Sequence, residues 1–367
     1  MFLAFAVYIF LLVAFCFSGY FSENIYYSNQ SIQKNQKGFV LWNSPMILTF
    51  VVMLLLIGLR YNVGVDYLGY EIDYLNYGNG KNVSFEIGFK YIIAFLNYLE
   101  LGPWSMFMVS AGLIMFFFIS AFKDFPYLLK WGLFFCFTTG FFFATMNGLR
   151  QTIALMIFFN AVRSIISRSV LKFHFLIILG LCFHLSILLV YPFYFFIHRI
   201  SFTDKRWLIV YFGAYITSYL IGLKGLILFF INLVPQYAQY ALVITENYEK
   251  PKAAGFGNYY NVLIGAFIIF FSRELVKKMP YLKVYYNFFF IGGIFFNLFW
   301  LNSVMGRLTY LFIWFKVFCL AGMMYLLGKS KWSALLYLII LGEIVLFLYR
   351  ILAHGSLCSP FQFIELE

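Results

Sequence analysis

The stretch SPMILTFVVMLLLIGLR, residues 44–60, decides the fold class, because it holds no charged side chain before Arg60. About 20 apolar residues in a helix cross the ~30 Å hydrocarbon core of a bilayer. Similar stretches recur near residues 1–20, 44–60, 104–122, 131–146, 150–165, 173–197, 207–233, 258–272, 285–301, 307–327 and 332–350. The sequence therefore predicts an all-α, polytopic integral membrane helix bundle of roughly 11–12 transmembrane helices.

Composition excludes an ordinary soluble domain. Hydrophobic residues make up 63% of the 367 positions and charged residues only 11%, whereas a soluble domain carries about 25% charged residues. The apolar stretches run from end to end, so we expect one transmembrane domain over residues 1–367. The net charge of +12 follows from basic cytoplasmic loops and does not indicate nucleic-acid binding.

The charged connections predict the topology. Cytoplasmic loops carry excess lysine and arginine, which applies to the basic groups Lys34/Lys37, Lys123/Lys130, Arg163/Arg168/Lys172, Arg273/Lys277/Lys278/Lys283 and Lys329/Lys331. The two longer connections, residues 61–103 and 235–258, are then extracytoplasmic. Within the first, residues 85–101 are weakly apolar, which favours an interfacial helix over a crossing.

Alternation of sides fails between residues 173 and 234. A basic loop at residues 198–206 and the loop after Pro235 cannot both obey the charge rule with single crossings. We expect a break of the 207–233 stretch at Gly222–Gly225, as occurs where helices border a cavity.

Three arginines stand beside glycine at predicted span ends on the outer side: Arg60, Arg150 and Arg307. One alternative is that each extends to lipid headgroups. Arginine also offers a planar fork of donors that matches phosphate oxygens, and glycine lets backbone amides approach the same anion. Three such residues on the side where basic residues are scarce indicate a diphosphate site.

Carboxylates alternate with tyrosines after the first of these arginines. Asp66 is followed by Tyr67 and Tyr70, and Glu86 lies further along the same loop. Sugar hydroxyls bind acidic side chains, and sugar ring faces pack on aromatic rings. The pattern is compatible with a glycan site, although an aromatic belt with solvated charges is the alternative.

Polar residues also lie inside or beside predicted spans: Asn147, Gln151, His184 and Ser186. Such residues are functional candidates because an unpaired polar group in a membrane is costly. His184 offers either a general base or a donor to a phosphate oxygen. A structural hydrogen bond to a neighbouring helix is the alternative.

Several chemistries have no recognisable motif in the sequence. It holds no G-x-x-x-x-G-K-[ST] loop, no H-E-x-x-H, no G-x-S-x-G and no clustered cysteines and histidines. We therefore predict neither a metal nor a cofactor.

The motifs together resemble the EpsG branch of the Wzy-type bacterial polysaccharide polymerases. Those that carry the resemblance, in chain order, are Gly58-Leu-Arg60, Asp66-Tyr67 with Tyr70, Glu86-Ile-Gly-Phe, Asn147-Gly-Leu-Arg150-Gln151 with Ala154, Phe183-His184-Leu-Ser186, and Arg307 with Tyr310. The resemblance implies a glycosyltransferase of the bacterial cytoplasmic membrane. It would join undecaprenyl-diphosphate-linked oligosaccharide repeat units at the outer face into O-antigen, capsule or exopolysaccharide.

The resemblance also implies residue roles and partners. Its catalytic residues would be Arg150, His184, Asp66 and Glu86. Substrate binding would involve Arg60, Arg307, Asn147, Gln151, Tyr67, Tyr70, Ser186 and Tyr310. Besides lipid-linked donor and acceptor and the bilayer, the implied partners are a chain-length regulator and a flippase of the same pathway.

Two other classes remain open at this stage. A lipid-linked oligosaccharide flippase or other transporter predicts charges near the bilayer midplane and paired repeats, and the sequence has neither. A membrane sugar acyltransferase predicts a histidine on the cytosolic side.

Overall fold

The computed structural model describes residues 2–28, 40–220, 255–299, 309–328 and 330–364. In these ranges the chain is helical, and its one β contact is an isolated bridge between Arg60 and Phe363. The main helices are α1 (Phe2–Ser28), α3 (Ser44–Gly58), α4 (Tyr67–Gly78), α5 (Ile87–Tyr98), α6 (Trp104–Ser120), α7 (Leu129–Thr138), α8 (Phe141–Thr145), α9 (Leu149–Ile166), α10 (Val170–Leu181), α11 (Phe193–Phe196), α12 (Trp207–Leu220), α15 (Phe256–Lys278), α16 (Leu282–Phe299), α18 (Lys316–Leu327) and α19 (Ser333–Leu352). The prediction of an all-α fold is confirmed.

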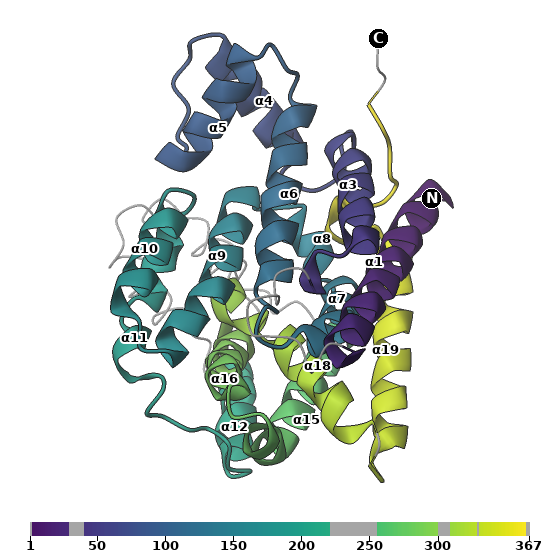
Figure 1. Ribbon diagram of the computed structural model, residues 1–367, viewed down its shortest axis with the longest axis vertical. Coiled ribbons are helices and arrows are strands. Elements are labelled where there is room, and N and C mark those ends of the chain that lie inside the picture. The colour runs from purple at the N-terminus through teal and green to yellow at the C-terminus, as the bar shows by residue number, and fades with distance from the viewer. Residues whose placement is uncertain (1, 29–39, 221–254, 300–308, 329, 365–367) are drawn as a thin grey trace. The chain divides into compact units, whose positions relative to one another are not determined.

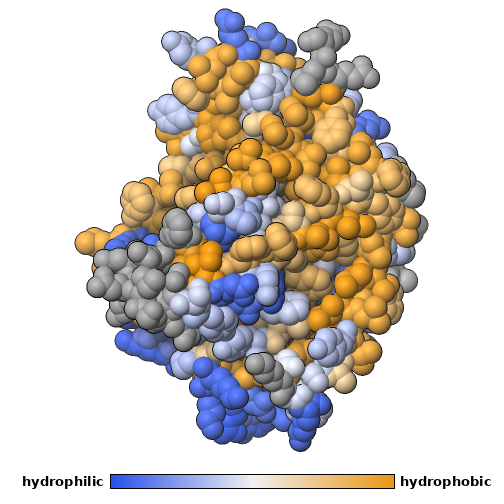
Figure 2. All heavy atoms as spheres, turned by 45° about the vertical axis from the view of Figure 1, so that its right-hand side comes forward, coloured by the Kyte–Doolittle hydropathy of each residue, from blue (hydrophilic) through white to orange (hydrophobic). Residues whose placement is uncertain are grey.

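Length and hydropathy of the helices confirm a polytopic membrane protein. Among the described residues, 6 helices are long and apolar enough to cross a membrane. Five shorter apolar helices accompany them: Ser44–Gly58, Trp104–Ser120, Val170–Leu181, Leu185–Phe196 and Trp207–Ser218. Many helices also expose large hydrophobic side chains, and Figure 2 shows one face on which such residues predominate. Lipid is the solvent that such a surface requires.

Two predicted spans are interrupted. The stretch 131–146 forms α7 and α8, because the chain takes a left-handed backbone at Gly140 (φ 84°) that no α-helix continues through. The stretch 173–197 forms α10, the 3₁₀ helix η3 (Leu185–Val190) and α11. Irregularity was expected in the second region, but the predicted break at Gly222–Gly225 lies outside the described residues.

The described chain forms two compact units. Unit 1 comprises residues 1–195 and 327–367, and unit 2 comprises residues 196–326. The single transmembrane domain therefore stays a prediction. In unit 2, Tyr211 of α12 packs against α15 and α16. The Tyr211 hydroxyl donates to the Val262 carbonyl (3.3 Å), and the Asn297 side-chain amide donates to the Tyr211 carbonyl (2.9 Å).

In unit 1, the main helix contacts join α1 with α3 and α7, α3 with α6, α6 with α9, and α9 with α10. Buried polar contacts fix the α1–α3 pair. Ser18 and Thr49 share a 2.9 Å hydrogen bond, and Asn43 donates to Ser22 at 2.8 Å. Asn43 also caps α3 by accepting from the Met46 N–H at 3.0 Å. Figure 1 shows α4 and α5 together at the end of unit 1 where α6 begins.

Helix α5 exposes one apolar face and buries another. Phe89, Ile93 and Leu96 are buried, whereas Tyr91 and Phe95 are exposed. A short helix with an apolar exposed face is compatible with an interfacial position. That position stays a prediction, since no membrane is present.

Candidate functional site

Arg60, in the turn after α3, is held entirely by backbone carbonyls. Its Nε donates to Val63 (3.1 Å), and its two terminal nitrogens donate to Ile57 (3.0 Å) and Met146 (3.2 Å). The guanidinium also lies 4.7 Å from the centre of the Phe107 ring, and the residue is 1% exposed. Arg60 thus ties its own turn to the turn before α9.

The turn before α9 is held in place by Asp66, which precedes α4. The Asp66 carboxylate accepts the Gly148 N–H at 2.8 Å, and the Asn147 side-chain oxygen lies 3.4 Å from the Asp66 nitrogen. Gly148 has a left-handed backbone (φ 49°) and begins α9. A helix N-terminus presents unpaired N–H groups and the positive end of the helix dipole. Asp66 therefore acts as a cap of α9 that is contributed from another element.

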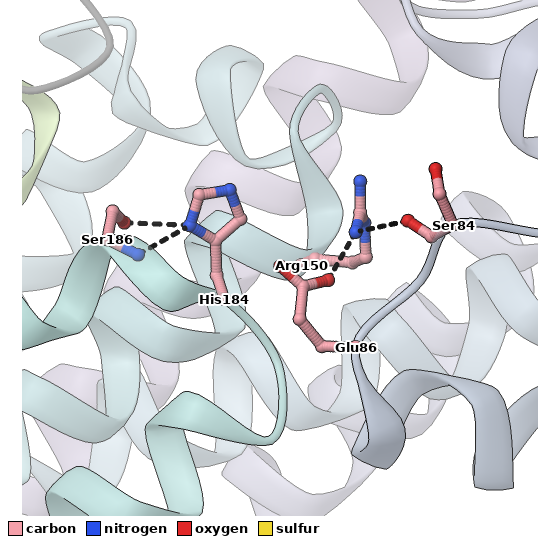
Figure 3. A network of polar contacts seen from close by, with 5 residues as sticks. All are labelled: Ser84, Glu86, Arg150, His184 and Ser186. Atoms are coloured by element: carbon pink, nitrogen blue, oxygen red, sulfur yellow. Dashed lines mark hydrogen bonds and ion pairs between the residues drawn. The ribbon is translucent and has the colours of Figure 1, made fainter. Parts of the chain in front are cut away.

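Arg150, in the first turn of α9, forms an ion pair with Glu86. One terminal nitrogen also lies 3.5 Å from the Ser84 carbonyl, and the guanidinium stands 4.7 Å from the centre of the Phe85 ring. Both side chains of the pair are partly exposed, 23% for Arg150 and 24% for Glu86. The Nε of Arg150 is buried and has no hydrogen-bond partner in the part of the chain that the structure describes. Figure 3 shows the contacts of Arg150 with Glu86 and Ser84.

Two tyrosines of α4 have different positions relative to the ion pair. The hydroxyl of Tyr70 interacts with the guanidinium of Arg150. Burial raises the pKa of Tyr70 above its ordinary value, although Arg150 acts in the opposite direction, so the phenol is neutral at pH 7. Tyr67 is buried and stacks on Phe107, with ring centres 4.3 Å apart. Tyr67 therefore offers no exposed ring face to a sugar in this structure.

Close backbone contact joins the start of α5 to the turn after α10. The Gly88 N–H donates to the Cys182 carbonyl at 2.8 Å. A Cβ atom at Gly88 would lie 2.7 Å from that oxygen, closer than real contacts allow. Glycine at this position lets the Glu86 segment lie against the turn that carries His184.

His184 begins η3 and is oriented by its neighbour Ser186. The His184 Nδ1 lies 2.8 Å from the Ser186 hydroxyl and accepts the Ser186 backbone N–H at 3.2 Å. A backbone N–H can only donate, so a neutral imidazole with this contact carries its proton on Nε2. His184 in this state is a hydrogen-bond donor through Nε2.

A C-terminal segment, residues 355–364, packs on the Arg60 turn; we call it the terminal strap. The Tyr61 N–H donates to Gln362 (2.9 Å), the Ile364 N–H to Leu59 (2.9 Å) and the Gly64 N–H to Leu357 (2.8 Å). In addition, the Tyr8 hydroxyl of α1 donates to the Cys358 carbonyl. The strap thereby braces the turn that holds Arg60.

A family model, the EpsG family, matches residues 43–363. The chain belongs to the EpsG family. This membership indicates a multi-pass membrane protein with a glycosyltransferase function like that of a polysaccharide polymerase. The resemblance to the EpsG family that the sequence motifs indicated is confirmed. Comparisons with curated proteins and with solved structures give no match.

Several of the EpsG motifs meet within unit 1. Within unit 1 the structure brings together Asp66 with Asn147 and Gly148, and Glu86 with Arg150 and Tyr70. Gln151 lies beside Arg150 in the first turn of α9 and is half-buried. Tyr310 belongs to unit 2, where it is 42% exposed, and Arg307 lies outside the described residues, so the prediction that both residues share this site stays a prediction. The substrate-binding roles of all these residues stay predictions.

Sequence reasoning missed the backbone and aromatic parts of the EpsG site. Phe85 directly precedes the quoted motif Glu86-Ile-Gly-Phe, and its place beside Glu86 was the available signal. The strap gave no signal, because its contacts are made by backbone groups that any residue but proline supplies. The EpsG match, which reaches residue 363, includes all of the strap except its last residue, Ile364. In the described ranges no group of three or more histidine, cysteine, aspartate or glutamate residues could hold a metal ion.

Proposed function

We propose that this EpsG-family protein extends a lipid-linked glycan by glycosyl transfer at the outer face of the membrane, with Arg150 binding the leaving diphosphate. The observation that carries the proposal is the setting of Arg150. Its guanidinium lies against Glu86 and Phe85 at the start of a helix, and it has a buried donor without a partner among the described residues. An arginine in such a setting is a preorganised donor for an anion.

In the proposed reaction a hydroxyl oxygen of the acceptor glycan attacks the anomeric carbon of the donor glycan. The new bond is a glycosidic C–O bond. The bond that breaks joins the anomeric carbon to the diphosphate, which leaves with its polyprenyl lipid and both electrons of that bond. The proton of the attacking hydroxyl passes to a carboxylate. Because the diphosphate supplies the driving force, no nucleotide is required outside the cytoplasm.

The ion pair between Glu86 and Arg150 suggests which carboxylate accepts the proton. With no substrate bound, each charge neutralises the other, which lowers the cost of holding both away from water. An arriving diphosphate competes for the guanidinium, as its oxygens match the arginine fork. Glu86 then loses its partner and becomes a better general base. Asp66 is less suited to this role, because its carboxylate holds the N-terminus of α9.

His184 has a supporting part in the proposal. Its Nε2–H, set by the Ser186 contacts, is a donor suited to an oxygen of the diphosphate or of the sugar. Arg60 is a positioning residue, because each of its three nitrogens donates to a backbone carbonyl and the residue is buried. For Arg60 to bind diphosphate directly, its buried side chain would have to become exposed.

The remaining details extend the proposal to substrates and location. The lipid carrier is undecaprenyl, the membrane is the bacterial cytoplasmic membrane, and a flippase and a chain-length regulator act in the same pathway. O-antigen, capsule and exopolysaccharide are the products compatible with this activity.

Deletion of the gene in its native host, scored for surface polysaccharide and for lipid-linked intermediates, tests the proposal. We expect single repeat units to accumulate on their carrier at the outer face, and plasmid-borne wild type to restore long chains. Repeat units retained on the cytoplasmic side would indicate a flippase instead. Full-length chains lacking only acyl substituents would indicate an acyltransferase.

A further inference from the structure

A pocket of about 720 Å³ lies between α6, α9 and α10, away from the Arg150 site. Its lining combines two kinds of side chain. Lys123, Arg163 and Lys172 contribute positive charge, and Phe116, Leu171 and Phe175 contribute apolar surface. No acidic residue lines it among those described.

The charges of the pocket are not balanced. Arg163 pairs with Asp124, whose carboxylate lies 2.6 Å from the arginine Nε and 3.1 Å from one terminal nitrogen. Lys123 and Lys172 are exposed, and neither forms an ion pair within the described ranges. Two lysines at one pocket therefore remain available to an anion.

The apolar lining is unusually exposed for a site that binds a small soluble anion. Leu171 is 81% exposed, Phe175 66% and Phe116 46%. A soluble phosphate would gain nothing from these side chains, whereas an acyl chain would cover them. Cations beside exposed apolar side chains match an amphiphile with an anionic head.

The position of the pocket agrees with such a ligand. Arg150 and Arg163 stand at opposite ends of α9, so the pocket is about 20 Å from Arg150 along the helix axis. The α9–α10 connection is one of the basic loops expected in the cytoplasm. Anionic lipids are enriched in the cytoplasmic leaflet, and basic pockets between membrane helices bind the headgroups of these lipids.

We propose that this pocket binds an anionic glycerophospholipid of the inner leaflet. The lipid phosphate lies between Lys123 and Lys172, and one acyl chain runs along Phe116, Leu171 and Phe175. The site is separate from the glycosyl-transfer site and does not depend on the proposed function.

Lipid titration followed by native mass spectrometry tests the proposal on the full chain purified in detergent. The probes are phosphatidylglycerol and phosphatidylcholine with identical acyl chains. We expect the wild type to retain phosphatidylglycerol in preference to phosphatidylcholine. The double variant Lys123→Gln/Lys172→Gln should bind it about 25-fold more weakly, roughly 5-fold for each lysine, with phosphatidylcholine binding unchanged.

A matched control is Lys277→Gln/Lys278→Gln, which removes the same charge from exposed lysines at the end of α15. This control should keep the wild-type preference. Equal affinity of wild type and pocket variant for phosphatidylglycerol, or an equal loss in both double variants, would overturn the proposal. Displacement of phosphatidylglycerol by millimolar glycerol phosphate would also overturn it, since the site would then recognise a soluble phosphate.

Discussion

At the scale of single residues, two identical tripeptides have different surroundings. Gly58-Leu-Arg60 and Gly148-Leu-Arg150 have the same local sequence, and the sequence predicted that both arginines belong to one diphosphate site. Arg60 is enclosed by three carbonyls, whereas Arg150 faces a carboxylate and keeps one buried donor without a partner among the described residues. Segments distant in the chain cause the difference, so local sequence could not distinguish the two.

Replacement of Arg150 should abolish long-chain polymer while leaving the protein in the membrane. Arg150→Ala removes a preorganised donor to developing negative charge, which typically costs about 10²- to 10³-fold in rate. Arg150→Lys keeps the charge but loses the fork, so we expect strong impairment there too. Polysaccharide ladders from a complemented deletion strain, at matched expression, provide the measurement. A normal ladder from Arg150→Ala would remove the diphosphate-binding role.

The two candidate carboxylates should respond differently to amide substitution. Asp66→Asn keeps an oxygen that can accept the Gly148 N–H, so we expect substantial activity to remain. Glu86→Gln removes the proposed base and should lower the rate by about 10²-fold or more. Chain-length distributions of the two variants in one strain make the comparison. The reverse ranking would assign the base to Asp66.

At the scale of elements, most helices were predictable from hydropathy alone. The window 150–165 became α9 and the window 332–350 became α19, each within two residues at either end. Helix interruptions were harder to predict. The break within residues 131–146 depends on the left-handed backbone at Gly140, and Arg350 of α19 packs beside this residue. Hydropathy cannot predict that contact, because the two residues are far apart in the chain.

Contact between α5 and the turn after α10 should be sensitive to one methyl group. Gly88→Ala places a Cβ 2.7 Å from the Cys182 carbonyl and 2.8 Å from the Cys182 Cβ. Overpacking of this kind costs typically about 1–3 kcal/mol. We expect reduced polymer length and a lower thermal unfolding midpoint in detergent. Gly69→Ala in α4, where nothing lies within 4 Å of the added methyl group, is the control and should resemble wild type.

At the scale of the whole molecule, the charge pattern predicts on which side of the membrane each connection lies. We expect the α4–α5 connection outside and the α9–α10 connection inside. Asn79 and Ser167 are exposed residues in these connections. In a cysteine-free background, Asn79→Cys should react with a membrane-impermeant maleimide in intact cells. Ser167→Cys should react only after permeabilisation. Labelling of both in intact cells would contradict the alternation scheme.

The terminal strap also determines when the site is completed during synthesis. The Tyr8 hydroxyl meets the Cys358 carbonyl, 350 positions later in the sequence. Ribosomes add about 5–20 residues per second, so roughly 20–70 s separate the emergence of these two partners. For most of that interval α1 and the Arg60 turn are already made, while the Tyr61 and Gly64 amides lack their strap carbonyls. A nascent chain therefore carries Arg60 long before it has the finished support around the Arg60 turn.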